Sequence, residues 1–450
     1  MSSKTKTTAT KEDGKVAGAS SSKARQKEQD APTTLVPKLR FPEFHDSDDW
    51  QTKLLGDLCK IRTGKKDANE GASDGQYPFF TCAENHIFSR SYSFDAEAIL
   101  IAGNANVGQT RYYSGKFEAY QRTYVLTDFS GISVPYLYAI LNAKLRESLL
   151  AHVQVSAMSY IKLPMLQEYA LAVPPSPAEQ QKIAECLSSV DELMAAQARK
   201  VDALKTHKKG LIQQLFPRVA GASSSKALET GEQDAPATFE TQPRLRFPEF
   251  QNAGEWVEEK LEDLAKRGSG HTPNKTKDEY YNGGIKWVSL ADSKRLDNGL
   301  ISETTIVISE QGIKKSSAVL HPAGSVILSR DAGVGKSAVM SESMAVSQHF
   351  IVWTCDKRRL SNWFLYYILQ IKKPVFENVA SGSTIKTIGL PFFKEMRIAV
   401  PQVKEQQRIA ECLTSLDDLI AAQTQKLEAP KTHKKGLMQQ LFPSPEEAEA

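Results

Sequence analysis

The 450-residue sequence lacks several features that mark common protein classes. No apolar run approaches the ~18–20 residues that a membrane-spanning helix requires. Residues 1–38 lack the apolar stretch that a secretory signal peptide contains, so we expect a cytoplasmic protein. The five cysteines form no Cys-x-x-Cys pair. This pattern indicates neither a disulfide framework nor a zinc site, and we predict reduced thiols and no metal.

Motifs of nucleotide and methyl-donor chemistry are also missing. Residues 332–337 read AGVGKS, but a phosphate-binding loop would need glycine where Arg330 stands. The GSG at 268–270 lacks the third glycine of a dinucleotide fingerprint, because Pro273 occupies that position. The sequence contains no Asn-Pro-Pro-aromatic tetrapeptide of the kind that amino-methyltransferases use. We therefore predict no catalytic centre and no cofactor bound by this chain.

What the sequence does contain is a long internal repeat. Residues 179–217 read EQQKIAECLSSVDELMAAQARKVDALKTHKKGLIQQLFP, and residues 405–443 read EQQRIAECLTSLDDLIAAQTQKLEAPKTHKKGLMQQLFP. The offset is 226, and 28 of these 39 positions are identical. Shorter repeats precede each half: AGASSSK at 17–23 and 220–226, and LRFPEF at 39–44 and 245–250. The chain is therefore two tandem units.

Between the repeats lie two segments that share only short echoes with each other. Two equal helices suit two copies of one partner or one symmetric framework, whereas two unequal domains suit two different ligands. The predicted organisation is a flexible segment at 1–38, a first variable domain at 39–174, a long helix at 175–217, a flexible linker at 218–244, a second variable domain at 245–400, a long helix at 401–443, and a tail at 444–450.

Each repeated segment has the heptad pattern of a coiled-coil helix, with apolar residues at alternating spacings of four and three. The predicted seam consists of Ile183, Leu187, Val190 and Met194 in the first helix and Ile409, Leu413, Leu416 and Ile420 in the second. It continues through Gln197 and Gln423, which either pair to fix the register or point to solvent. An antiparallel pair is expected, each helix spanning ~58 Å at ~1.5 Å per residue. The alternative is that each helix packs inside its own domain.

Local signals mark the start of the first helix and an irregularity in the second. Ser176-Pro177-Ala178-Glu179 fits a capping box with proline at the first helical position, and Gln402 is a poorer cap. Pro430 falls on the second seam and is expected to kink that helix.

Both variable domains have the mixed pattern of an α/β fold. The expected strands are Ala98–Ala102, Thr123–Leu126, Ile285–Leu290, Ser325–Ser329 and Phe350–Thr354, and the expected helices are Val134–Ala151 and Leu360–Asn378. Lys and Arg exceed Asp and Glu by 21 to 17 over 245–400, but the first domain has 13 against 15 over 39–174. A nucleic-acid partner therefore does not follow from charge alone, since a domain without net positive charge can still present a basic face.

Polar and glycine residues collect in the loops between these elements. Such side chains read base edges and hold phosphates. The candidate DNA-contacting residues are Lys65, Asn104, Asn106, Arg111 and Arg122 in the first domain, and Lys294, Arg330, Lys336, Gln348, Thr384 and Lys386 in the second.

The two helical repeats, PSPAEQQKIAECLSSVDEL and PQVKEQQRIAECLTSLDDL with their KTHKKGLIQQLFP and KTHKKGLMQQLFP ends, resemble the repeat regions of type I restriction-modification specificity subunits. In the second domain SRDAGVGKSAV, AVSQHF and SGSTIKTIGLPFF resemble a target recognition domain of that family. In the first, GNANVGQTRYYSGKF and SYIKLPMLQEYALAVP resemble another subtype.

The resemblance implies a non-catalytic subunit of an adenine-N6 methyltransferase and restriction endonuclease. Each target recognition domain would read one half of an asymmetric bipartite site in double-stranded DNA, and the helices would set the spacer. Expected partners are two methyltransferase subunits, which carry S-adenosylmethionine, and two restriction subunits, which use ATP and Mg²⁺. The alternatives are a coiled-coil adaptor for other proteins and a stand-alone enzyme.

Overall fold

The computed structural model describes residues 36–152, 160–217, 242–382 and 386–443. The chain divides into two compact units, which we call the first unit (1–191 and 432–450) and the second unit (192–431). The two long helices, α5 (Pro177–Leu215) and α11 (Val403–Leu441), contribute residues to both. Among the described residues, no helix is long and apolar enough to cross a membrane.

The first unit is built on a six-stranded sheet of order β2-β7-β5-β6-β3-β4, beside a two-stranded sheet of β1 and β8. Its strands are β1 (Gln51–Leu54), β2 (Lys60–Thr63), β3 (Tyr77–Phe80), β4 (Ile87–Ser89), β5 (Phe94–Ala102), β6 (Thr110–Ala119), β7 (Thr123–Thr127) and β8 (Ala170–Val173). Its shorter helices are α1 (Leu55–Leu58), α2 (Val134–Ile140), α3 (Arg146–His152) and α4 (Leu163–Gln167).

Apolar runs explain the centre of this sheet. The second half of β5 and all of β7 are buried, as their continuous apolar sequences predict. Helix α2 continues through a π-helical segment, Leu141–Leu145, into α3. The single helix expected at Val134–Ala151 is therefore confirmed in position. Strand β6 was not predicted, because polar and aromatic residues fill both its exposed and its half-buried positions, so its sequence TRYYSGKFEA shows no apolar run.

The second unit contains a five-stranded sheet of order β10-β18-β15-β16-β12, a four-stranded sheet of order β13-β11-β17-β14, and the pair β19-β9. Its strands are β9 (Val257–Lys260), β10 (Ala265–Ser269), β11 (Tyr281–Val288), β12 (Leu300–Ile301), β13 (Ile306–Ile308), β14 (Leu320–His321), β15 (Val326–Ser329), β16 (Ser337–Met340), β17 (Met344–Val346), β18 (Phe350–Cys355) and β19 (Arg397–Val400). Its shorter helices are α6 (Leu261–Leu264), α7 (Glu310–Lys314), α8 (Asn362–Ile371), α9 (Lys373–Val379) and α10 (Leu390–Lys394).

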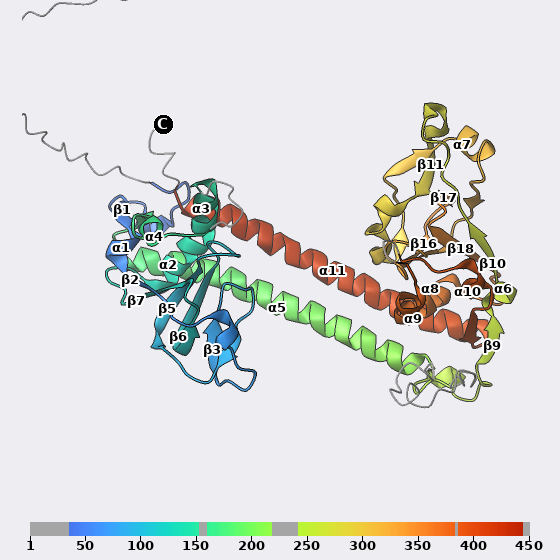
Figure 1. Cartoon of the computed structure of the whole chain (residues 1–450), viewed down its shortest axis with the longest axis horizontal. Coiled ribbons are helices and arrows are strands. Elements are labelled where there is room, and N and C mark those ends of the chain that lie inside the picture. The colour runs from blue at the N-terminus through green and yellow to red at the C-terminus, as the bar shows by residue number, and fades with distance from the viewer. Residues whose placement is uncertain (1–35, 153–159, 218–241, 383–385, 444–450) are drawn as a thin grey trace, which may run out of the picture. The chain divides into compact units, whose positions relative to one another are not determined.

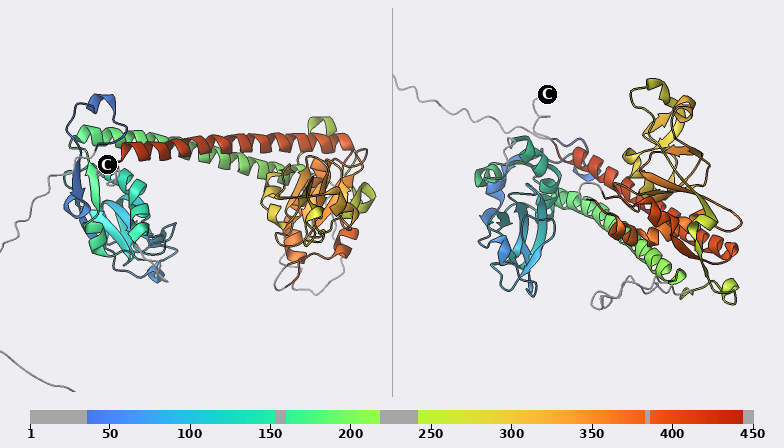
Figure 2. Two further views of the ribbon diagram at one scale, coloured as in Figure 1. Left: turned by 90° about the horizontal axis from the view of Figure 1, so that it is seen from above. Right: turned by 45° about the vertical axis from the view of Figure 1, so that its right-hand side comes forward.

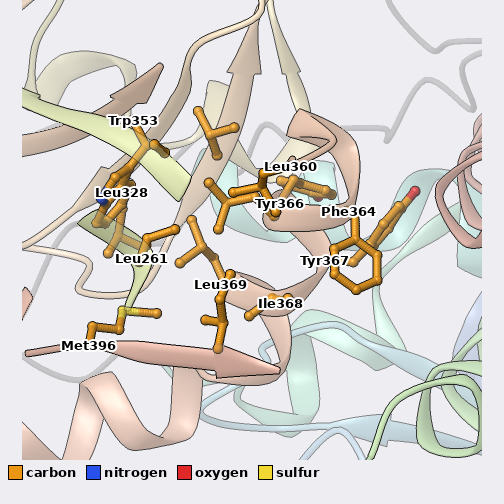
Figure 3. Packing of buried hydrophobic residues seen from close by; sticks show 14 of the residues in the cluster. Leu261, Leu328, Trp353, Leu360, Phe364, Tyr366, Tyr367, Ile368, Leu369 and Met396 are labelled. Atoms are coloured by element: carbon orange, nitrogen blue, oxygen red, sulfur yellow. The ribbon is translucent and has the colours of Figure 1, made fainter. Parts of the chain in front are cut away.

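Helix α8 packs against β15 and β16 and forms the centre of the main core of this unit (Figure 1). Its sequence NWFLYYILQI is apolar on most faces, and six of its ten residues are buried. Figure 3 shows Leu328 and Trp353 of the sheet on one side of this cluster and Leu369 and Ile368 of α8 near its middle. The expected mixed α/β fold is confirmed in both units.

Within the second unit, α5 and α11 run antiparallel and lie side by side (Figures 1 and 2). Gln197 donates from Nε2 to the carbonyl oxygen of Gln423 at 2.8 Å and to its Oε1 at 2.9 Å. Further along α5, Lys208 forms an ion pair with Asp417, which lies earlier in α11. The two glutamines therefore pair with each other rather than with solvent, and Gln423 is buried.

The eight residues predicted for the helix seam fall into two groups. Ile183 and Leu187 are buried in the core of the first unit, and Ile409 and Leu413 in the main core of the second. The other four, Val190, Met194, Leu416 and Ile420, are half-buried. The outer part of the seam thus packs against a variable domain as well as along the helix. Helix α11 continues through Pro430, and its kink stays a prediction.

At the start of each long helix, a buried glutamate forms an ion pair with an arginine of the LRFPEF repeat that precedes the variable domain. Arg40 donates from Nε and Nη2 to Glu179 at 2.8 Å each, and Arg246 donates in the same way to Glu405 at 2.7 Å each. Both carboxylates are 1% exposed. The side chain of Glu179, which a capping box would direct to the backbone of Ser176, therefore has another role, although Ser176 Oγ does accept from Glu179 N.

The glutamine that follows each of these glutamates joins the helix to its variable domain. Gln180 Oε1 accepts from Ser133 N, just before α2, and Gln180 Nε2 donates to Pro174 O. Gln406 makes the corresponding bonds to Ser361 N, just before α8, and to Pro401 O. The repeated Glu-Gln pair thus anchors each long helix to an arginine and to a domain helix.

The far end of each long helix packs against the opposite half of the sequence. Leu215 and Phe216 lie in the core of the second unit, where Phe216 stacks on Phe364 with ring centroids 5.3 Å apart. Leu441 and Phe442 lie in the core of the first unit. The second helical repeat therefore ends inside the first unit, where an antiparallel helix pair would bring it.

We predict that Arg40→Ala lowers the free energy of unfolding of the first unit by about 3–5 kcal/mol, because it leaves the buried Glu179 carboxylate without its charged partner. Lys182→Ala is the matched control, since Lys182 pairs with Glu43 at 3.2 Å but both side chains are 47% exposed. It should cost about 0–1 kcal/mol. Urea unfolding measures the free energy of unfolding of both variants. Equally small losses in the two would contradict a stabilising role for the buried Arg40–Glu179 ion pair.

Candidate functional site

The loop between β5 and β6 gathers four of the five candidate residues of the first domain. Asn104 and Asn106 lie in this loop, Arg111 follows it in β6, and Arg122 precedes β7 and offers its carbonyl oxygen to Gly103 N at 2.9 Å. Asn106 Nδ2 donates to Cys82 O at 2.9 Å, and Arg111 donates to the carbonyl oxygens of Ala83 and Glu84. Asn106 and Arg111 therefore also brace the neighbouring loop.

The side chains of Lys65 and Arg122 are exposed, whereas Asn104 is half-buried. Asn104 forms an isolated antiparallel bridge with Tyr160, so its backbone position is fixed from a second segment. Lys65 follows Gly64, where a Cβ would lie 1.8 Å from the carbonyl oxygen of Ala119. Only glycine permits this close approach.

In the second domain the corresponding loop joins β15 to β16 and contains Arg330 and Lys336. Lys336 Nζ lies 2.6 Å from Asp297 Oδ2 and donates to Ser293 O at 3.3 Å, so it ties the loop to the segment beside Lys294. Gln348 lies at the turn before β18 and accepts from Thr272 Oγ1 at 2.6 Å. Lys294 and Lys386 are exposed, and Thr384 lies outside the described residues.

These two loops have the same backbone frame, although the domains share little sequence. Five backbone hydrogen bonds recur with every residue number raised by 227. They are Ala102 N to Gln109 O and Ser329 N to Lys336 O; Gly108 N to Ala102 O and Gly335 N to Ser329 O; Gln109 N to Asn106 O and Lys336 N to Gly333 O; Gly103 N to Arg122 O and Arg330 N to His349 O; and Ile161 N to Gly103 O and Ile388 N to Arg330 O. We call these the matched loops.

Other features of the matched loops agree. The bridge of Asn104 to Tyr160 has its counterpart in the bridge of Asp331 to Thr387. Ala105 and Ala332, also equivalent, both have positive φ, 53° and 34°. Such a conformation is uncommon for residues other than glycine, and it stores strain of order 1–3 kcal/mol.

Gly64, which precedes Lys65 in the first domain, has an equivalent in Gly270 of the second domain. A Cβ on Gly270 would lie 1.7 Å from the carbonyl oxygen of Val346, as one on Gly64 would approach Ala119. The two domains thus hold equivalent chain segments in one arrangement and place different side chains on it. Framework residues are equivalent, whereas the polar side chains at the surface positions are not.

Sequence reasoning missed two ionisable residues of this site. Asp331 and His349 were not among the candidates, yet His349 Nδ1 lies 2.7 Å from Asp331 Oδ2. The strings GNANVGQ and RDAGVGK do align on Val107/Val334 and Gly108/Gly335, and both valines are buried. That alignment is the signal that would have revealed the equivalence of the loops. No cluster of three metal-ligating side chains occurs in the part of the chain that the structure describes.

Comparison with known families adds a match to the model of the type I restriction modification DNA specificity domain, at residues 47–206 and again at 253–429. Each match contains one variable domain with its matched loop and much of the long helix that follows. Together the two matches cover well over half of the chain.

The chain belongs to the family of type I restriction-modification specificity subunits.

Individual relatives agree with this assignment. The type I restriction enzyme EcoDI specificity subunit of Escherichia coli is 42% identical over 142 residues, which are 32% of this chain and 31% of that subunit. The MjaVIII specificity subunit of Methanocaldococcus jannaschii is 24% identical over 431 residues, 90% of this chain and 93% of that one. The strong likeness to the Escherichia coli subunit thus spans under a third of its length.

A solved structure shows the same fold. The crystal structure of the S subunit of a type I restriction-modification system from M. genitalium superposes with a TM-score of 0.59 at 15% identity, covering 91% of this chain and 100% of that one. The fold of a specificity subunit, two mixed α/β domains with long helices, is therefore shared at low sequence identity.

We predict that Gly270→Ala destabilises the second domain of this specificity subunit by about 3 kcal/mol, because the added Cβ must displace the Val346 backbone. Gly210→Ala in α5 is the control: its Cβ would meet nothing within 4 Å. That substitution should be neutral or stabilise by up to about 1 kcal/mol through helix propensity. Thermal unfolding of both variants tests the pair, and a harmless Gly270→Ala would refute the close approach.

Proposed function

We propose that this chain is the DNA sequence-specificity subunit of a type I restriction-modification complex, in which each variable domain reads one half of an asymmetric bipartite site. The observation that carries the proposal is the pair of matched loops. A single backbone frame that carries different side chains in two domains of one chain suits two related but different half-sites. Membership of the specificity-subunit family supplies the class of ligand, DNA.

Binding strength would come chiefly from exposed cations near the matched loops. Lys65, Arg122, Lys294 and Lys386 are suited to phosphate contacts, which are independent of sequence and weaken with salt. The half-buried polar side chains of the loops are suited to base edges. The target adenine would then leave the base stack and enter a partner's active site, as base-modifying enzymes require.

The long helices would set the spacer between the half-sites. A buried polar pair such as Gln197 with Gln423 fixes the register of a helix pair, because a slipped register leaves amides without partners. Lys208 with Asp417 adds an ion pair to the same alignment. A fixed register would give a fixed distance between the bases that the two domains read.

The helices would also dock two methyltransferase subunits. Many identical residues of the repeat serve the internal framework described above, but Leu193 and Leu419, which are equivalent, are 58% and 41% exposed. Exposed leucines at matching positions of two helices suit two copies of one partner. The methyltransferase subunits would carry S-adenosylmethionine, and two restriction subunits would carry ATP and Mg²⁺; this chain would bind no cofactor, catalyse no reaction and act in the cytoplasm.

The proposal is tested by co-expressing the chain with its cognate methyltransferase subunit and mapping methylated adenines across the genome by single-molecule sequencing. We expect one bipartite motif, with one half lost or changed when either variable domain is replaced. A motif that survives both replacements, or an intact complex that methylates no motif, would contradict the proposal and favour a protein-binding adaptor.

We predict that Leu193→Asp together with Leu419→Asp reduces co-purification of the methyltransferase subunit at least tenfold, because it charges both exposed apolar positions. Each single variant should retain one copy, measured by native mass spectrometry. Glu192→Gln and Asp418→Asn, at neighbouring exposed positions, are the controls and should retain both copies. Full retention of both copies by the double aspartate variant would exclude these leucines as the docking positions.

A further inference from the structure

The matched loops place different chemistry at three equivalent positions. The first domain has Gly103, Asn104 and Arg122, and the second has Arg330, Asp331 and His349. Each set contains one guanidinium, but it stands at a different point of the frame. The backbone frame is therefore the same in both domains, while the side chains at these three positions differ.

In the second domain the three side chains form a single polar cluster. Arg330 Nε lies 3.6 Å from Asp331 Oδ1, and Asp331 Oδ2 lies 2.7 Å from His349 Nδ1. Because an ionised carboxylate can only accept, His349 Nδ1–H is the donor of that bond. Asp331 is thus held between a guanidinium and an imidazole, and its side chain is 13% exposed.

This cluster is incompletely satisfied. Among the described residues, Arg330 Nε and Asp331 Oδ1 are buried and have no hydrogen-bond partner. Most of the other buried side-chain polar atoms of the described residues do have partners, as is usual in folded proteins. The 3.6 Å gap between Nε and Oδ1 is slightly too long for a hydrogen bond, and a shift of less than 1 Å would close it.

We propose that Arg330, oriented by Asp331 and His349, reads a guanine edge in the half-site of the second domain, and that the equivalent positions Gly103, Asn104 and Arg122 give the first domain its different preference. The inference rests on the proposed function and adds the specificity-determining residues. Arginine is well suited to contact guanine O6 and N7 in the major groove, because its planar donor fork can bind both atoms at once.

The geometry favours a base over a phosphate as the partner of Arg330. Its charge is offset by the adjacent Asp331 carboxylate, which weakens non-specific attraction to the DNA backbone. The same carboxylate, 3.6 Å from Arg330 Nε, attracts that edge of the guanidinium and so favours a defined orientation, which a base edge requires and a phosphate does not. The exposed Lys294 and Lys386 have no such acidic neighbour within ion-pair distance among the described residues and suit phosphates better.

The strain in the loop fits this role. Ala332, two residues after Arg330, has a φ of 34°, and Gly333 and Gly335 also have positive φ. Strained backbone persists where surrounding contacts impose it, and the bonds from Gly335 N to Ser329 O and from Lys336 N to Gly333 O close the loop around Ala332. The backbone of Arg330 is itself held by hydrogen bonds at both its N–H and its carbonyl oxygen, so its side chain projects from a fixed position.

The test uses the full chain in complex with its methyltransferase subunits and duplexes that carry the methylated motif or single base-pair changes of it. In Arg330→Ala, discrimination should fall roughly 5- to 150-fold at one G·C pair of the second half-site and remain unchanged at the others. Arg330→Lys should behave like the alanine variant, because lysine retains the charge but lacks the planar donor fork.

A uniform loss of affinity on every duplex, with rescue by Arg330→Lys and a shallower dependence on salt, would assign Arg330 to a phosphate and overturn the proposal. Unchanged discrimination at every base pair would also overturn it. Arg358→Ala is the matched control, since Arg358 lies 3.6 Å from Asp356 in the same unit but its side chain is 91% exposed. Thermal unfolding confirms that each variant is folded.

A second variant separates this inference from the proposed function. The triple substitution Arg330→Gly, Asp331→Asn and His349→Arg gives the second loop the side chains of the first. The methylated motif should then change at one position of the second half-site, with the first half-site intact. An unchanged motif would refute the role of these three positions while leaving the subunit's function in place, whereas absence of any motif from the wild-type complex would refute the function itself.

Discussion

Burial of one carboxylate at the start of each long helix is the constraint on which the rest of the structure depends. Glu179 and Glu405 are almost completely enclosed, and a charge in that position is tolerable only when it is paired and hydrogen-bonded. Arg40 and Arg246 meet that need, and each comes from an LRFPEF segment that precedes a variable domain. The ion pair therefore joins the segment before each domain to the helix that follows it.

The arrangement of each unit follows from these two ion pairs. The glutamine after each glutamate binds the backbone at the start of a domain helix, so the long helix and the domain share one core. At their far ends the helices supply Leu215 and Leu441 to the cores of the second and first unit. Equivalent residues of the two repeats thus make equivalent contacts. Each unit contains core residues from both halves of the chain.

A rigid frame of this kind permits variation elsewhere. The matched loops keep the same five backbone bonds while Gly103, Asn104 and Arg122 give way to Arg330, Asp331 and His349. Backbone bonds, buried valines and close glycine contacts depend little on the exposed side chains, so recognition chemistry can change without loss of the fold. This separation of framework from exposed side chains agrees with the proposed function, in which each domain would read a different half-site.

The sequence by itself determined the tandem repeat, the long helices, the buried apolar strands and the family resemblance, because repeats, heptads and apolar runs are all visible along the chain. Tertiary structure alone decided which of the polar residues meet. Gln197 and Gln423 were equally compatible with pairing and with solvent, and only the helix register joined them. Asp331 and His349 are 18 residues apart. Their contact depends on backbone bonds between strands, and no local pattern encodes those bonds.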